Sequence, residues 1–133
     1  MVAQDKAPEA EAKEESGKLE IGSTVPSLQL EGIEWLQGEP VSSLNEKGKV
    51  YMIECWATWC GPCIASIPHI NELHKKFGDK GFVIVGMNVW EDGIEKAKDF
   101  VSGQGDKMSY RVAYSGGKGS EFENKWLKAA DIK

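Results

Sequence analysis

The feature that most constrains the fold is an apolar, strand-like run that leads directly into two cysteines three residues apart. Val50–Ile53 is rich in residues that favour β-structure, and the chain then turns through Ala57 and Thr58 to Cys60 and Cys63. An apolar helical pattern follows. Because residues i and i+3 lie side by side on a helix, the two thiols can close a small disulfide ring.

The position of the first cysteine predicts its reactivity. We expect Cys60 to lie at the helix N-terminus, where unpaired N–H groups and the helix dipole favour a thiolate. The thiolate is the nucleophilic form of cysteine. Cys60 is therefore predicted to attack and Cys63 to resolve, which makes redox chemistry the first functional hypothesis.

Composition limits the alternatives. A chain of 133 residues with 41% hydrophobic residues is long enough for one globular domain with a core, and too short for two. A net charge of −5 does not favour binding to nucleic acid or to an anionic membrane. Three cysteines, an odd number, do not indicate a fold built on several disulfides. We find no apolar run of membrane-spanning length and no signal peptide at Met1. The chain is thus either cytosolic or a mature protein whose targeting segment was removed.

The first 20 residues have the composition of a tail. Six acidic residues against three lysines give this segment −3 of the net charge, and it has no aromatic residue. Such a segment cannot bury enough apolar surface to offset the entropy of ordering it. We expect residues 1–20 to be a disordered acidic tail or a tether to a membrane anchor, and residues 21–133 to form the domain.

Apolar patterning predicts the elements around the motif. We interpret residues 27–42 as a β-hairpin at the edge of the main sheet, with a turn near Gly38 and Pro40. The motif helix is expected to continue to Phe77, to kink at Pro68, and to end at Gly78 and Gly81.

The remaining pattern alternates strands with helices. The run 82–89 is typical of a strand covered on both faces, and 110–114 is predicted to be a short strand. Capping boxes at Asp92–Glu95 and Ser120–Glu123 predict two further helices. The order β-β, β-α-β-α-β-α implies parallel crossovers and an α/β fold.

The motif resembles that of a known superfamily. The sequence W-A-T-W-C-G-P-C, the proline five residues after the second cysteine (Pro68), and the strand before them resemble the thioredoxin superfamily. The expected hairpin, the W-A-T-W form and the run K-G-F-V-I-V-G-M-N-V are closer to its TlpA-like, extracytoplasmic branch. The resemblance covers residues 21–133.

That resemblance implies a fold, an activity and partners. The fold is thioredoxin-like, the activity is that of a thiol-disulfide oxidoreductase acting by dithiol–disulfide exchange, and Gly61-Pro62 resembles the reducing members. It implies protein dithiols or disulfides and an upstream electron donor as partners, no cofactor, and a place in the periplasm or cell envelope. Trp59, Gly61 and Pro62 are expected to form the motif surface on which partners dock.

Glu54 interrupts the apolar strand six residues before Cys60. Thioredoxins carry a buried aspartate at this position. Burial raises a carboxyl pKa, so Glu54 is a candidate acceptor for the proton of Cys63. The alternatives are that Glu54 faces solvent or pairs with a lysine. In the TlpA-like branch an acid is common three residues after the second cysteine, where this chain has Ser66.

Two other functions use the same sulfurs. A non-catalytic metal or copper site would recruit His69 and His74, but His69 is six residues past Cys63 and faces another direction on a continuous helix. A thioredoxin-fold peroxide reductase would need a lone peroxidatic cysteine in a different context. We therefore predict no metal, and expect both histidines to face solvent.

The other cysteine and the tryptophans are expected to pack, with one exception. Cys55 is interpreted as a small core residue and Trp56 as a packing residue, as are Trp35, Trp90 and Trp126. Trp59, next to the nucleophile, is expected to be exposed.

The positions of the prolines raise a further expectation. None of the five follows Pro68, whereas thioredoxin-like proteins carry a cis-proline on a later strand that shapes the substrate groove. We therefore expect the domain to be C-terminally incomplete, without the closing hairpin and last helix. The strand edge left open would favour self-association.

Overall fold

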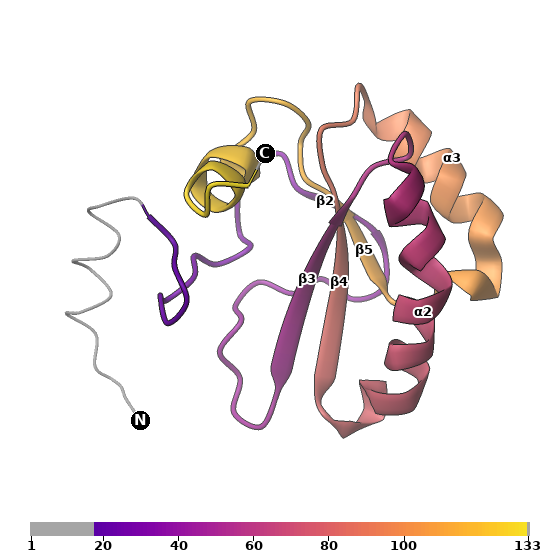
Figure 1. Ribbon diagram of the computed structural model, residues 1–133, viewed down its shortest axis with the longest axis horizontal. Helices are drawn as coiled ribbons and strands as arrows, with labels where there is room; N and C mark the ends of the chain where they lie inside the picture. Colours follow the sequence, from indigo (N-terminus) through magenta and orange to yellow (C-terminus); the bar gives the residue numbers. More distant parts are fainter. Residues whose placement is uncertain (1–17, 133) are drawn as a thin grey trace.

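The computed structural model describes residues 18–132, and these form a sheet of four strands with helices on both faces (Figure 1). The predicted acidic tail, residues 1–20, lies almost entirely outside the described residues. The strand order is β2-β5-β4-β3. The strands are β2 (Glu34–Gln37), β3 (Val50–Trp56), β4 (Phe82–Asn88) and β5 (Arg111–Tyr114).

The three strands that follow the N-terminal segment run parallel, as the alternating pattern predicted. β3 pairs with β4 from Val50↔Phe82 to Trp56↔Asn88, and β4 pairs with β5 in the same direction. β2 is antiparallel to β5, and its register shifts between Trp35 and Gln37. The carboxyl ends of β3 and β4 therefore lie together, and this edge carries the cysteine motif.

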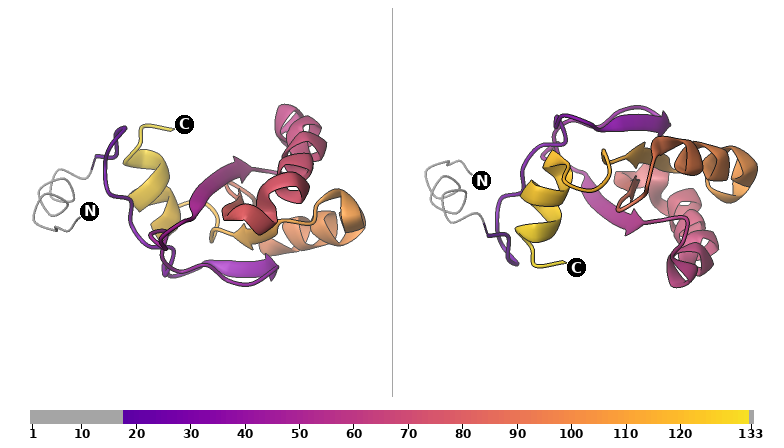
Figure 2. Two further views of the ribbon diagram at one scale, coloured as in Figure 1. Left: turned by 90° about the horizontal axis from the view of Figure 1, so that it is seen from below. Right: turned by 90° about the horizontal axis from the view of Figure 1, so that it is seen from above.

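Two helices, α2 (Gly61–Phe77) and α3 (Ile94–Gln104), cover one face of the sheet (Figures 1 and 2). Short 3-10 turns follow each of them, η1 (Gly78–Lys80) and η2 (Gly105–Lys107). The core on this side contains Trp56, Ile67, Ile70, Ile84, Val101 and Tyr110.

The second face is covered by the final helical segment and the chain before β3. The final segment is π-helical over η3 (Glu123–Lys128). Its Phe122 and Leu127 pack with Leu28, Val85 and Met87. β4 is buried along almost its whole length, which confirms the prediction of a strand covered on both faces.

The hairpin predicted over residues 27–42 is wrong. Only β2 forms there, and it pairs with β5 rather than with a neighbour in sequence. Leu28 N–H bonds to the carbonyl of Ser42 at 2.6 Å, and Leu28 is buried in the core. The apolar residues of this segment cover the second face of the sheet, because burial there outweighs the pairing of a short isolated hairpin.

The capping box predicted at Ser120–Glu123 forms only in part, because the Glu123 side chain bonds to the N–H of Gly119 and not to that of Ser120. Glu123 N–H donates to Ser120 Oγ at 3.2 Å, and the Glu123 carboxylate accepts from Gly119 N–H at 2.6 Å. The box predicted at Asp92–Glu95 is wrong, because α3 begins at Ile94, its N-cap residue is Gly93, and no side chain caps it. Asp92 instead pairs with Lys96, at 3.7 Å on the surface. Among the described residues, no helix is both long and apolar enough to cross a membrane.

Candidate active site

Cys60 and Cys63 form a disulfide at the start of α2, with their Cα atoms 5.3 Å apart. Cys60 is the N-cap residue, and its Sγ accepts a hydrogen bond from Cys63 N–H at 3.3 Å. Ile64 N–H closes the first turn on the Cys60 carbonyl at 3.0 Å. No acidic residue lies in this first turn. A thiolate at Cys60 would thus meet free helix N–H groups and no acidic side chain within that turn.

The surface beside the disulfide is apolar and exposed. Trp59 is 62% exposed, as predicted, and its indole N–H donates to the carbonyl of Trp90 at 3.1 Å. Gly61 and Pro62 are exposed, and a side-chain carbon at Gly61 would meet nothing within 4 Å. Cys63 is half-buried and packs against the core beneath α2. Cys60 is also half-buried, but of the two cysteines only Cys63 packs against that core.

A buried carboxylate that the sequence analysis missed fixes the loop before Cys60. Glu91 is 2% exposed and accepts from Thr58 N–H at 2.9 Å and Thr58 Oγ1–H at 2.7 Å. It also accepts from Asn88 Nδ2–H at 2.9 Å. Burial alone would raise the pKa of Glu91, but the bonds from Asn88 and Thr58, together with the charge of Lys96, hold it below its usual value.

The backbone at Trp90, just before the buried Glu91, has an unusual conformation. Trp90 has φ 54°, in the left-handed region that a bulky residue rarely adopts. That conformation presents the Trp90 carbonyl to Trp59 while Glu91 reaches Thr58. The position of Glu91 in the sequence could have revealed its role. It follows a buried parallel strand, and the carboxyl ends of adjacent parallel strands lie at the same edge of the sheet, where the cysteine motif also lies.

Glu54 lies within β3, opposite Gly86 of β4, and is half-buried. Its Oε1 atom is buried and has no hydrogen-bond partner among the described residues. Burial raises the pKa of Glu54 from 4.5 to about 7, the direction that was predicted. Whether it accepts a proton from Cys63 stays a prediction.

The other predicted residues take ordinary places, with one correction. Pro68 is exposed within α2, and the Ser66 hydroxyl donates to the Cys63 carbonyl at 2.9 Å. Cys55 is half-buried, and burial together with the nearby charge of Glu54 raises its pKa to about 11. Cys55 is therefore a poor nucleophile at neutral pH.

The correction concerns the histidines. His69 is exposed as expected, but His74 is half-buried because its ring packs against Tyr110 with centroids 6.3 Å apart. Within residues 18–132, no group of three or more His, Cys, Asp or Glu side chains could hold a metal ion.

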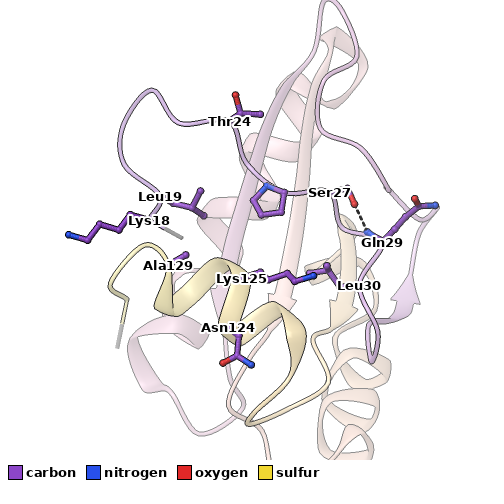
Figure 3. Close-up of a pocket in the computed structure, with 10 residues that line it drawn as sticks. Lys18, Leu19, Thr24, Ser27, Gln29, Leu30, Asn124, Lys125 and Ala129 are labelled. Carbon is purple, nitrogen blue, oxygen red and sulfur yellow. Dashed lines mark hydrogen bonds between the residues drawn. The ribbon is translucent and has the colours of Figure 1, made fainter. Parts of the chain in front are cut away.

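A pocket of about 540 Å³ lies between the N-terminal segment and the final helical segment, away from α2 (Figure 3). Leu19, Pro26 and Leu30 form one wall, and Asn124, Lys125 and Ala129 from the final helical segment form the other. Figure 3 shows no thiol or acid among the side chains drawn there. We assign the redox site to the cysteine motif and not to this pocket.

Comparison with known proteins gives the family. The sequence matches the Redoxin family over residues 20–128. The chain belongs to the Redoxin family. Its similar relatives include "Thiol-disulfide oxidoreductase ResA" of Bacillus thuringiensis (strain Al Hakam), 32% identical over 95 residues, which are 71% of this chain and 53% of that protein. "Protein FixW" of Rhizobium leguminosarum is 27% identical over 121 residues, 86% of this chain and 52% of that protein.

Solved structures similar to this Redoxin chain give the same fold. A "thiol:disulfide interchange protein, thioredoxin family protein" from Chlorobium tepidum TLS has a TM-score of 0.50 at 30% identity, covering 67% of this chain and 59% of that one. StoA from Bacillus subtilis, at 20% identity, also has a TM-score of 0.50, covering 69% and 66%. The fold is thioredoxin-like, as the motif implied. The chain spans about half the length of the curated relatives it matches.

Proposed function

We propose that this Redoxin chain is a thiol-disulfide oxidoreductase that acts through Cys60 and Cys63. The observation that carries the proposal is the disulfide at the first turn of α2, with Cys60 as the N-cap. Relatives named thiol-disulfide oxidoreductase support it. A metal-binding module and a peroxide reductase have no comparable support in the described residues.

The reaction is dithiol–disulfide exchange. The Cys60 thiolate attacks a substrate disulfide, a mixed disulfide forms, and one substrate thiolate leaves. Cys63 then loses its proton and attacks the Cys60 sulfur, which releases the second substrate thiolate and regenerates the Cys60–Cys63 disulfide. Two electrons pass from the protein dithiol to the substrate disulfide, and Gly61-Pro62 is consistent with a reducing direction.

Glu54 is the proposed acceptor of the Cys63 proton. It lies on the face of β3 that α2 covers, and a carboxyl with a pKa of about 7 is ionised about half the time at neutral pH. Ser66, at the position where the TlpA-like branch carries an acid, cannot serve as this base. No acidic residue lies in the first turn of α2, and the buried Glu91 is already engaged by Thr58 and Asn88, so Glu54 is the carboxyl that we propose for this step.

The proposed partners are proteins. The exposed Trp59, Gly61 and Pro62 form an apolar surface at the disulfide on which a protein dithiol or disulfide can dock, and an upstream electron donor would use the same surface. We propose that the protein works outside the cytoplasm, in the periplasm or cell envelope, and the TlpA-like character of the motif supports this. We also propose self-association through the unpaired edge of β3.

The test is insulin-disulfide reduction with dithiothreitol as electron source, in the full chain and in three variants. Cys60→Ser should abolish turnover, Cys63→Ser should trap mixed disulfides, and the control Cys55→Ser should keep wild-type turnover. In the reduced protein, iodoacetamide should modify Cys60 first at pH 7. Faster alkylation of Cys63 or Cys55, or turnover by Cys60→Ser, would contradict these roles.

A further inference from the structure

Two consecutive residues just before Cys60 are hydrogen-bonded to two consecutive residues of another loop. Thr58 donates twice to the Glu91 carboxylate, at 2.9 Å from its N–H and at 2.7 Å from its hydroxyl. The indole N–H of Trp59 donates to the carbonyl of Trp90 at 3.1 Å. Surface loops are usually the more mobile parts of a fold. The turn before the nucleophile is instead held by the loop that follows β4.

The loop after β4 is itself anchored to the sheet. Asn88, the last residue of β4, is buried and donates to Glu91 at 2.9 Å, while its carbonyl accepts from Ser115 N–H at 3.0 Å. Val89 N–H donates to the carbonyl of Trp56 at 2.8 Å, which extends the contact between the ends of β3 and β4. The hydrogen bonds that Glu91 accepts therefore fix the turn relative to the sheet.

The backbone of Trp90 indicates that this arrangement serves a function. Its φ of 54° lies in the left-handed region, which is unfavourable for a residue with a side chain. Within residues 18–132, Asp131 is the other non-glycine residue with a positive φ. Such strain persists where the surrounding contacts impose it, and it is common at functional sites. Here those contacts are the hydrogen bonds that the Trp90 carbonyl and the Glu91 carboxylate accept.

The exposed part of this arrangement is Trp59. Its side chain is 62% exposed although its N–H is hydrogen-bonded, so the indole presents an apolar face in a fixed orientation. A protein that packs on a fixed side chain does not have to order it, and this preorganisation favours binding. A small disulfide needs only access to the Cys60 sulfur, so it gains little from a fixed indole. The arrangement should therefore distinguish the two kinds of substrate.

We propose that Glu91 and the Trp90 carbonyl hold Trp59 in position for partner proteins, and thereby favour protein disulfides over small disulfides as substrates. This inference rests on the proposed exchange reaction at the cysteine motif, and it adds the class of substrate that the site selects. Glu91 is a positioning residue: it accepts hydrogen bonds and transfers neither a proton nor an electron. Its lowered pKa keeps the carboxylate charged at neutral pH, and a charged acceptor makes the stronger hydrogen bonds.

The experiment compares a protein disulfide with a small one, in the full chain carrying Cys55→Ser so that only the motif thiols react. Insulin reduction with dithiothreitol gives kcat and KM, and thionitrobenzoate release from 5,5′-dithiobis(2-nitrobenzoate) gives a second-order rate constant. Glu91→Gln and Thr58→Val weaken the same hydrogen bonds from opposite sides, alone and combined. Asp92→Asn is the matched control, because it removes a negative charge from the same loop at an exposed side chain that pairs with Lys96. Urea midpoints verify folding, and Thr58→Val decides alone if Glu91→Gln does not fold.

We expect the ratio of insulin kcat/KM to the small-disulfide rate constant to fall by about threefold or more in both single variants, through a higher KM. The ratio should stay at the parent value in Asp92→Asn. The double variant should lose no more than Glu91→Gln, because both changes act on one set of hydrogen bonds.

Three results would overturn the inference: an unchanged ratio in either folded single variant, losses that add in the double variant, or an equal loss in the control. Cys60→Ser separates the two proposals. Insulin turnover by that variant, or none by the parent, refutes the exchange reaction itself. An inactive Cys60→Ser together with unchanged ratios in the other variants refutes only the selection of protein disulfides.

Discussion

At the scale of a residue, Glu54 is an acid held where its charged form is disfavoured. Because its folded pKa, about 7, exceeds the ordinary 4.5, the folded state binds the extra proton between these values. Stability from this group is therefore fully present below about 4.5 and is lost as the pH rises toward 7. The charge is tolerated above that range at a cost to folding.

Removing that charge should stabilise the oxidised protein at high pH only. We expect Glu54→Gln to raise the free energy of unfolding at pH 8 by on the order of 1–2 kcal/mol, less than the full pKa shift would give because the side chain is partly solvated. At pH 5 the change should be small, since folded Glu54 is then protonated. Urea titrations at both values measure this, with Glu72→Gln on exposed α2 as the control. Equal shifts at pH 5 and 8 would refute the buried-charge explanation.

At the scale of an element, the loop after β4 holds the loop after β3. Glu91 accepts three hydrogen bonds, two of them from Thr58, two residues before Cys60. Its lowered pKa means that this stabilisation is present above the ordinary carboxyl value and is lost as the pH falls through the folded one. The loop that carries the nucleophile is thus held by a residue from the loop after a different strand.

Weakening the hydrogen bonds between Glu91 and Thr58 should lower the stability of the protein and make the cysteine motif more mobile. Glu91→Gln replaces one acceptor oxygen with an amide that faces donors, so we expect a loss of about 1–3 kcal/mol in unfolding free energy. The indole of Trp59 should become more mobile, seen as lower fluorescence anisotropy. Glu95→Gln, exposed in the first turn of α3, is the control. A urea midpoint equal to that of the control would show that the hydrogen bonds of Glu91 contribute nothing to stability.

The space at Gly86 gives a second prediction at this scale. Gly86→Ala would place a carbon 3.0 Å from the buried ring of Tyr110, so we expect a loss of about 1–3 kcal/mol from overpacking. Gly103→Ala in α3 is the matched change, because nothing lies within 4 Å there and alanine favours the helix. In thermal unfolding, the midpoint temperature should be lower than that of the wild type for Gly86→Ala and higher for Gly103→Ala. A similar change in the midpoint temperature of both variants would argue against close packing at Gly86.

Local patterns predicted the elements and the cysteines, but not the contacts between distant segments. The motif helix, β4 and the exposed Trp59 follow from spacing and periodicity within a few residues. Glu91 meets Thr58 across 33 residues, and Tyr110 meets His74 only because β5 and α2 pack on one core. The hairpin prediction was wrong for the same reason, because the apolar residues of that segment pack against the second face of the sheet.

At the scale of the whole molecule, the sheet ends in an unpaired strand. β3 is the last strand in the order, and no strand in the described part of the chain pairs with its far edge. It is seven residues long and begins with Val50, which is 65% exposed. A long apolar edge is a template for pairing with another chain.

We expect two copies to pair through β3, edge to edge and antiparallel about a two-fold axis, because the same edge then satisfies both chains. Sedimentation velocity should show a mass that rises with protein concentration in the wild type. Val50→Lys puts a charge at the start of the edge and should shift the protein toward monomer, whereas Ser43→Lys adds the same charge on an exposed loop and should not.

The oxidised protein is used so that Cys55, with its raised pKa, remains the one free thiol within residues 18–132, and Cys55→Ser excludes an intermolecular disulfide. A wild type that stays monomeric at every concentration, or two lysine variants that behave alike, would refute pairing through β3.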